Sequence, residues 1–321
     1  MYGRGKEKMT EDNLMSKERA RGHGELISIC LLALTLLLGL VISGEGAEYV
    51  KDGMRLAVGC VIPSSFPFMI ISDIYVAYGR PENLVHIGAL FYRLFRIPAS
   101  GLGAFICGNV GGFPLGAKMC ADAYASGVLG KDDAERLIPL CNNPSCAFVI
   151  GGVGLGMWRD IRVGFILLIS IYTATGICAI VTRVNKIKND ITNNNIGQKY
   201  SFVESVKKSG ASSVSIISFI CLFSVVCGIL KKRIKYAFIL YPIYSVLEVT
   251  NAVSGLSAEA VFSPALRLSL CAFSLGFGGV CVGMQSSYFV LSSGLKMTKY
   301  YPLKFLEGAL AGGLSYLLYQ I

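Results

Sequence analysis

Long apolar stretches separated by short polar segments run through most of this chain. Several approach the length of roughly 20 apolar residues that a helix needs to cross a bilayer. Two others, at 56–78 and 236–255, contain prolines, and a proline inside a helix removes a hydrogen bond and bends it. The pattern predicts an all-α, polytopic membrane protein. The other predicted spans are 26–42, 163–182, 211–230 and 301–319.

A run rich in glycine and proline, Gly108–Lys118, lies between two apolar segments that look helical. Irregular backbone at membrane depth persists only where it is buried in protein or lines a wet cavity. We therefore expect a broken or re-entrant hairpin whose tip presents backbone N–H groups to a solute. A tight helix crossing is the alternative reading of the same glycines. The candidate substrate-binding residues here are Gly111, Gly112, Pro114 and Gly116.

Lys118 is the last residue of this run. A charged side chain within a membrane segment usually faces a cavity and has a function, although a lysine can also extend its ammonium to the interface. A second break follows, with Asn142, Asn143 and Ser145 between two apolar segments. These side chains could bind a carboxylate, or they could satisfy the ends of their own broken helix, and the sequence leaves both interpretations open.

The C-terminal part of the chain has candidates of its own. Glu248 and Asn251 lie on an apolar segment, where a carboxylate indicates proton or sodium coupling or a salt bridge to Lys118. A helix-end cap is the alternative. Gln285 and Ser286 are weaker candidates, at the positions that correspond to Lys118 and the residue after it in an internal repeat.

That repeat relates the two parts of the chain by a shift of 167 residues. A proline-containing segment precedes the glycines in both parts, with Pro67 and Pro242 in similar places. Paired apolar segments interrupted by glycine or proline are typical of transporters with inverted repeats, and they point to the binding site. The shift places Gly111, Gly112, Gly116 and Gly127 on Gly278, Gly279, Gly283 and Gly294.

The charge pattern suggests four parts. A polar cytoplasmic tail covers 1–25, a first transmembrane half 26–182, a basic cytoplasmic linker 183–208 and a second transmembrane half 209–321. We expect 26–42 to be a retained span, with a signal peptide as the alternative. Basic residues flank 211–230 on both sides, so either the flanking loops lie on opposite sides of the membrane or this segment re-enters.

Local signals add three expectations. Residues 83–96 form an amphipathic helix, either at the membrane interface or along a vestibule for anions. Asp132 and Glu135 match a capping box, which predicts a helix that starts there and runs to about Cys141. The glycines of 151–156 are expected to let helices approach closely.

Composition narrows the class further. The chain is 53% hydrophobic and only 16% charged, whereas soluble domains carry about 25% charged residues. Its net charge of +10 fits positive cytoplasmic loops, and no concentrated basic face indicates nucleic acid. Eleven cysteines lie mostly in apolar stretches, and with two histidines and no CxxC motif we expect neither a metal site nor a cofactor. The expected partners are the lipid bilayer and a small-molecule anion, and a homo-oligomer is compatible with the sequence.

Several of these residues together resemble the YlbJ-like family of sporulation integral membrane proteins, which carries the nucleoside-recognition "gate" domain. The resemblance covers roughly 50–320, and one departure is that Pro144 directly follows Asn143. The motifs that carry it are Gly112-Phe-Pro-Leu-Gly-Ala-Lys118, Gly127, Ala134-Glu-Arg-Leu137, Cys141-Asn-Asn143, Leu247-Glu-Val-Thr-Asn251 and Phe277-Gly-Gly279.

The resemblance implies a carrier-like protein of the cell membrane or outer forespore membrane of a spore-forming bacterium, with dipicolinate as the leading cargo. A nucleoside-type transporter and a non-transport assembly factor for sporulation are the alternatives. An enzyme is not expected, because His86 has no evident acidic partner and the Asp132–Asp133 pair lies at a helix start.

Overall fold

The computed structural model describes residues 45–78, 85–183 and 201–320, and no strand occurs in these ranges. The all-α membrane fold predicted from the sequence is confirmed. The helices are α2 Gly46–Leu56, η1 Ala57–Val61, α3 Ile62–Tyr78, α4 Val85–Phe95, α5 Ala99–Gly111, α6 Leu115–Ala125, α7 Lys131–Cys141, η3 Phe148–Met157, α8 Ile161–Val181, α9 Phe202–Arg233, α10 Ala237–Leu247, α11 Val249–Ala258, α12 Pro264–Phe277, α13 Gly279–Ser292 and α14 Tyr300–Tyr319, where η marks a π-helical segment.

The chain divides into two compact units, 1–49 and 50–321. The predicted tail 1–25 and the predicted first span 26–42 lie outside the described residues, as does most of the linker. In the first unit, Tyr49 donates a hydrogen bond from its hydroxyl to Glu45 at 2.7 Å. The site lies entirely in the second unit.

Three helical segments in the described part of the chain are long and apolar enough to cross a membrane, and a bent pair made by 46–61 and 65–71 could be a fourth. They are 161–181, 202–233 and 264–292. α9 is continuous over 32 residues, so it does not re-enter, and its basic flanks lie at opposite ends of one helix. The predicted linker extends to residue 208, but residues 202–208 already belong to α9. The last apolar run forms α14 but is not among these three segments.

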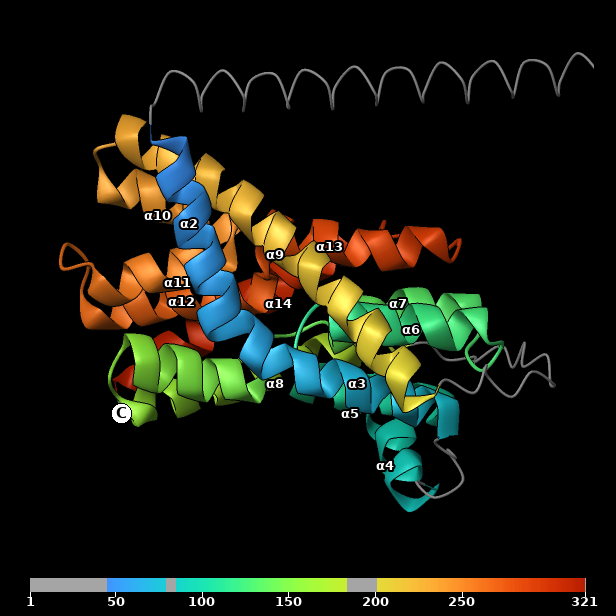
Figure 1. Ribbon diagram of the computed structural model, residues 1–321. Coiled ribbons are helices and arrows are strands. Elements are labelled where there is room, and N and C mark those ends of the chain that lie inside the picture. Colours follow the sequence, from blue (N-terminus) through green and yellow to red (C-terminus); the bar gives the residue numbers. More distant parts are fainter. Residues whose placement is uncertain (1–44, 79–84, 184–200, 321) are drawn as a thin grey trace, which may run out of the picture. The chain divides into compact units, whose positions relative to one another are not determined.

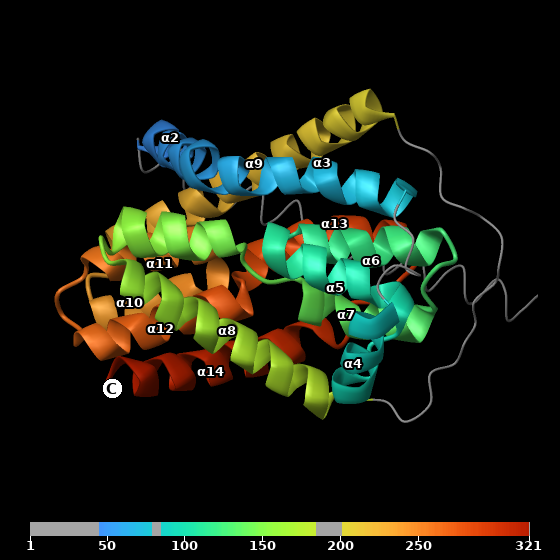
Figure 2. The same cartoon turned by 90° about the horizontal axis from the view of Figure 1, so that it is seen from below.

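α5 and α6 form a short hairpin, and α7 packs against both of them. η3 and α8 form a second hairpin, and Figures 1 and 2 show α8 beside the red helix α14, against which it packs. In the C-terminal half, α12 packs on α14, α11 and α8, whereas α13 packs on α6, α9 and α10. The gold helix α9 crosses α3 in both views and contacts it.

Of two local expectations, the structure corrects the capping box and agrees with the close approach at one glycine. α7 begins at Lys131 and ends at Cys141, as the pattern predicts, but its N-cap is Gly130, and Asp132 forms no capping box. Glu135 instead accepts a hydrogen bond from the backbone N–H of Lys296 at 3.0 Å. In η3, Gly154 does allow a close approach, because a Cβ there would lie 2.8 Å from the Cα of Gly164.

Five glycines of the described residues have positive φ, and all of them except Gly278 fall into two pairs at the shift of 167 residues. Gly112 and Gly279 have φ of 89° and 76°, and Gly127 and Gly294 have φ of 72° and 80°. L-residues other than glycine rarely adopt this region. Each half therefore breaks or ends a helix at corresponding glycines.

Candidate functional site

The helix break between α5 and α6 packs directly against the break between α7 and η3. A Cβ on Gly112 would lie 2.8 Å from the backbone nitrogen of Ser145, and one on Gly116 would lie 1.8 Å from the carbonyl oxygen of Cys141. Real Cβ atoms do not approach this closely, so only glycine fits here. Gly108 also faces the Cys141 carbonyl, with a Cβ distance of 2.5 Å. These glycines therefore allow the close helix packing that was the alternative interpretation of their sequence pattern.

Two further breaks lie in the second half. α10 ends at Leu247 and α11 starts at Val249, so Glu248 has the extended φ and ψ of −150° and 118° between them. A Cβ on Gly279, at the α12–α13 break, would lie 3.0 Å from the Leu247 carbonyl oxygen. The two breaks of this half therefore also pack on each other.

A small cavity joins the breaks of both halves. Its volume of about 20 Å³ suffices for about one water molecule, and no organic solute fits it in this conformation. The lining residues are Val61, Ser65, Gly111, Gly112, Phe113, Pro144, Ser145, Phe148 and Thr250. Thus Gly111, Gly112 and Ser145, three of the predicted site residues, meet the start of α11 at one point. Pro114, which precedes α6 as its N-cap, adjoins this group in sequence.

Asn143 is the centre of a fully buried polar network. Its Nδ2 atom donates to Asn109 Oδ1 at 2.7 Å and to Thr175 Oγ1 at 3.0 Å, while its Oδ1 accepts from Lys304 Nζ at 2.6 Å. Asn109 in turn donates to the carbonyl oxygen of Leu140 at 3.1 Å, which satisfies the end of α7. The second break is therefore tied to α5, α8 and α14.

Lys304 and Glu307 form an ion pair in the interior, 3.0 Å between Nζ and Oε2, and both residues are 0% exposed. The other carboxylate oxygen of Glu307 accepts a hydrogen bond from Thr175 Oγ1 at 2.7 Å. The pair therefore links α14 in the second half to α8 and the second break in the first half.

Asn142 makes a second connection between the halves. Its Nδ2 atom donates to Ser286 Oγ at 2.8 Å and to Tyr300 Oη at 2.7 Å. Its side-chain oxygen is buried without a hydrogen-bond partner. Ser286, a predicted site residue of the second half, thus meets a predicted residue of the first, while Gln285 donates to Cys281 Sγ on its own helix at 3.2 Å.

Glu248 caps α11 from within the protein. Its carboxylate accepts hydrogen bonds from the backbone N–H groups of Thr250 at 2.9 Å and Asn251 at 2.6 Å, and from the Asn251 amide at 2.7 Å. Asn251 also donates to Ser224 of α9 at 3.0 Å. A carboxylate at a helix N-terminus is stabilised by the N–H groups and the helix dipole. Glu248 therefore already occupies the anion position of α11.

Lys118 is 3% exposed and pairs with Asp122 one turn further along α6, at 3.2 Å. Asp122 also lies 3.7 Å from Lys208 of α9. Lys118 is thus buried and charge-compensated on the α9 side of α6, and these contacts are separate from the Asn143 network.

The most buried charges were missed in the sequence analysis. Lys304 and Glu307 lie within the predicted span 301–319 and are not among the predicted site residues. Opposite charges three residues apart on one helix face do, however, indicate an intramembrane site. Asn109, Thr175 and Tyr300 carry no comparable signal, because only the fold brings them next to the breaks. Among the described residues, no cluster of three His, Cys, Asp or Glu could hold a metal ion.

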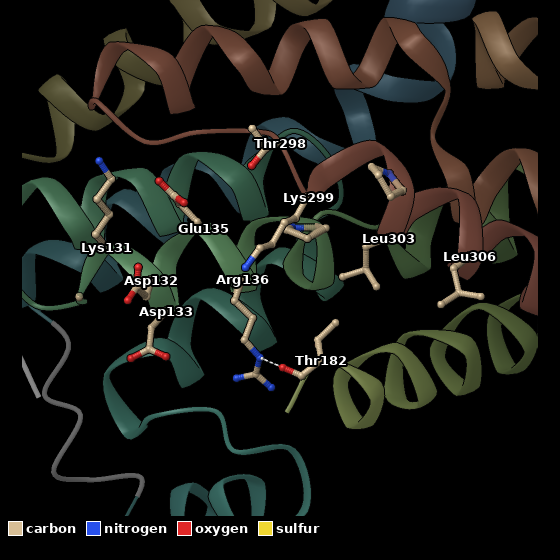
Figure 3. A pocket seen from close by; sticks show the side chains of 13 residues that line it. Lys131, Asp132, Asp133, Glu135, Arg136, Thr182, Thr298, Lys299, Leu303 and Leu306 are labelled. Atoms are coloured by element: carbon tan, nitrogen blue, oxygen red, sulfur yellow. Dashed lines mark hydrogen bonds between the residues drawn. The ribbon is translucent and has the colours of Figure 1, made fainter. Parts of the chain in front are cut away.

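A cavity of about 830 Å³ lies between α7 and α14, away from the breaks. Figure 3 shows Lys131, Asp132 and Glu135 of α7 on one side and Leu303 and Leu306 of α14 on the other, so the cavity has a charged and an apolar side. Its remaining lining residues are Gly130, Asp133, Arg136, Pro139, Thr182, Thr298, Lys299 and Pro302.

Arg136 borders this cavity but is fully engaged with backbone carbonyls. Its guanidinium donates to Thr182 at 2.7 Å and Ala179 at 3.3 Å, after α8 and in its last turn, and to Phe95 at 2.5 Å and Arg96 at 2.9 Å at the end of α4. One side chain therefore caps two helix C-termini. Figure 3 shows Arg136 pointing toward Thr182.

Comparison with known proteins agrees with a membrane role. The chain is similar to the sporulation integral membrane protein YlbJ of Bacillus subtilis (strain 168), with 23% identity over 88% of this chain and 80% of the relative. The chain is a multi-pass integral membrane protein. The similarity supports the predicted resemblance to the YlbJ-like family, whereas the nucleoside-recognition gate domain is not confirmed. No family model and no solved structure matches the chain.

Proposed function

We propose that this protein is a secondary carrier for a small organic anion, built from two inverted, related halves. The observation that carries the proposal is the meeting of three helix breaks, two from the first half and one from the second, at one small cavity that Gly112, Ser145 and Thr250 help to line. Interrupted helices in both halves of a membrane protein are the usual frame of a carrier's binding site. No catalytic step is assigned to these groups.

Cargo binding in this proposal takes place at the joint between the halves. Asn142, Asn143 and Ser145 line it from the first half and Ser286 from the second, and Lys118 supplies positive charge on α6. The cavity between the breaks has a volume of about 20 Å³, so the structure corresponds to an occluded conformation. The halves must separate before an organic anion can bind, which fits alternating access by rigid-body movement.

The leading cargo is dipicolinate, a dicarboxylate, and the proposed role is sporulation-linked, in the cell membrane or the outer forespore membrane. Similarity to the sporulation integral membrane protein YlbJ supports the sporulation-linked membrane role, and the choice of dipicolinate rests on the resemblance described from the sequence. The larger cavity, of about 830 Å³, has the size of ordinary small-molecule sites, about 300–1,000 Å³, and is the proposed access vestibule. Its wall carries charges of both signs, with Lys131 and Lys299 beside Asp132, Asp133 and Glu135.

The test is uptake of radiolabelled dipicolinate by proteoliposomes. The wild type should take up the anion in a saturable way, well above protein-free vesicles, and Lys118→Ala should reduce this uptake at least several-fold. Lys235→Ala, which removes the same charge from an exposed position, should leave it unchanged. Uptake no greater than in protein-free vesicles would contradict the function. Dipicolinate uptake that nucleosides suppress would favour the nucleoside-type alternative.

A further inference from the structure

The ion pair between Lys304 and Glu307 needs an explanation beyond packing. Both side chains are fully buried in α14, and their attraction only roughly repays the cost of removing two charges from water. Apolar side chains of similar volume would hold α14 in place as well. Ionisable groups in the interior of a membrane protein usually mark a pathway for protons, ions or substrate.

The groups around the Lys304 ammonium are those of a cation site. Nζ donates hydrogen bonds to the amide oxygen of Asn143 at 2.6 Å and to the carboxylate of Glu307 at 3.0 Å, and the hydroxyl of Thr175 donates to the other carboxylate oxygen of Glu307. Hard cations prefer such oxygen ligands. Here the protein's own ammonium occupies the cation position, so a change of charge at this site must come from a proton.

We propose that Glu307 is the proton-binding group that couples this carrier to its anionic cargo, which rests on the proposed function. One proton from water binds a carboxylate oxygen of Glu307 and forms an O–H bond. The charge of the pair changes from zero to +1, because Lys304 keeps its three protons. A carboxylate of the cargo then replaces Glu307 beside Lys304, so proton and anion are carried together.

The coupling follows from the cost of an unpaired buried charge. Protonation of Glu307 without an anion leaves the ammonium uncompensated, and binding of an anion without a proton places two negative groups beside one positive group. Each ligand therefore favours the binding of the other by the same free energy.

The surroundings of Glu307 contain few other titratable groups. The thiol of Cys141 in α7, the thiol of Cys178 in α8 and the phenol of Tyr300 in α14 are close enough to interact with it electrostatically. α12 approaches this part of α14 by backbone contact, since a Cβ on Gly276 would lie 3.0 Å from the Cα of Gly308. Lys304 is therefore the charged partner that decides the state of Glu307.

Glu248 is the natural comparison, because it is also a buried glutamate on an apolar segment, 1% exposed. Two backbone N–H groups and an amide hold its carboxylate at the start of α11. Both carboxylate oxygens of Glu248 are therefore engaged in capping its own helix, whereas Glu307 faces an ammonium. The geometry therefore assigns proton coupling to Glu307 and not to Glu248.

The first experiment needs no cargo. Infrared spectra of the purified Lys304→Met protein at neutral pH should show a carboxylic acid C=O band, because Glu307 without its ammonium partner takes up a proton. The band should disappear in Lys304→Met/Glu307→Gln and persist in Lys304→Met/Glu248→Gln. Lys304→Gln serves as the second variant if Lys304→Met does not fold. Identical spectra with and without Glu307 would overturn the proposal.

The second experiment counts protons. Calorimetric titration of the wild type with dipicolinate, in buffers of different ionisation enthalpy, should show uptake of about one proton per bound anion, and Glu307→Gln should lose it. Binding of dipicolinate without proton uptake overturns the coupling and leaves the carrier function standing. Absence of both dipicolinate binding and flux overturns the carrier function and the coupling that depends on it, even if the infrared band appears.

Discussion

Lys304 donates a hydrogen bond to the side-chain oxygen of Asn143 at 2.6 Å, across 161 positions of sequence. The contact joins the second helix break of the first half to a helix of the second half. Glu307 shares the same ammonium at 3.0 Å. The interface between the halves is thus held by charge and hydrogen bonds at a point where the rest of the interior is apolar.

The ion pair should behave as a unit in stability measurements. Lys304→Met or Glu307→Gln alone should each destabilise the protein by about 3 kcal/mol, because a buried charge loses its partner. The double variant should recover most of this loss, since no unpaired charge remains. Thermal unfolding in detergent measures all four proteins, and equal additive losses in the double variant would show that the two residues act independently.

Gly116→Ala should prevent folding, because the added Cβ would lie 1.8 Å from the Cys141 carbonyl oxygen. The backbone cannot yield here without moving the second break. Gly313→Ala is the matched control, since nothing lies within 4 Å of a Cβ at that position of α14. The yield of monodisperse protein after size-exclusion chromatography compares them, and a well-folded Gly116→Ala protein would refute the close packing of the breaks.

Arg136→Lys should lower thermal stability although it keeps the charge. A lysine cannot reach the ends of α4 and α8 at once, so several buried carbonyls lose a charged donor, each worth about 1.5–3 kcal/mol. Lys131→Ala, on the same helix but exposed, should leave the melting temperature nearly unchanged. Equal melting temperatures for Arg136→Lys and wild type would argue against the capping role.

Asp133 gives an expected pH dependence. Burial raises the pKa of its carboxyl, with a further contribution from Asp132 and an opposing one from Arg136. The folded pKa thus exceeds the unfolded value of about 3.9, and the folded state holds its proton more tightly. Stability relative to Asp133→Asn should therefore be highest below the unfolded pKa and fall as pH rises through the folded pKa.

Melting temperatures measured from about pH 4 to about pH 7 check this expectation. The advantage of Asp133→Asn over wild type should grow with pH across that range. Asp132→Asn removes the same charge from an exposed neighbouring position and is the control. A difference between Asp133→Asn and wild type that does not change with pH would contradict the effect of burial.

The spans and breaks could be predicted because their signals are local. Uninterrupted apolar runs gave α8 and most of α9, and glycine, proline and asparagine marked the breaks at Gly112 and Asn142. The capping box at Asp132 failed because Gly130 ends the preceding turn one residue before Lys131 and takes the N-cap position. The local sequence pattern could not decide between an N-cap at Gly130 and one at Asp132.

The polar network could not be predicted from the sequence. Asn143 meets Lys304 and Asn142 meets Ser286 only after the chain has folded, and neither pair shares a sequence pattern. Lys304 and Glu307 were visible in the sequence, but the apolar run around them indicated an ordinary span. Whether Lys118 or Glu248 binds cargo stays a prediction.

Gly108 and Gly116 both press on the Cys141 carbonyl, so α5, α6 and α7 form one rigid body with little room to bend at the first break. At the α12–α13 break the packing is less tight, because a Cβ on Gly278 would meet only Val282, at 3.4 Å, and one on Gly279 would lie 3.0 Å from the Leu247 carbonyl oxygen. Separation of the halves, as proposed, would break neutral side-chain hydrogen bonds such as Asn142 to Ser286, with a net value of about 1 kcal/mol, and charged ones such as Lys304 to Asn143, with about 1.5–3 kcal/mol. The helices on either side would keep their backbone hydrogen bonds, so the proposed opening follows the interface between the halves.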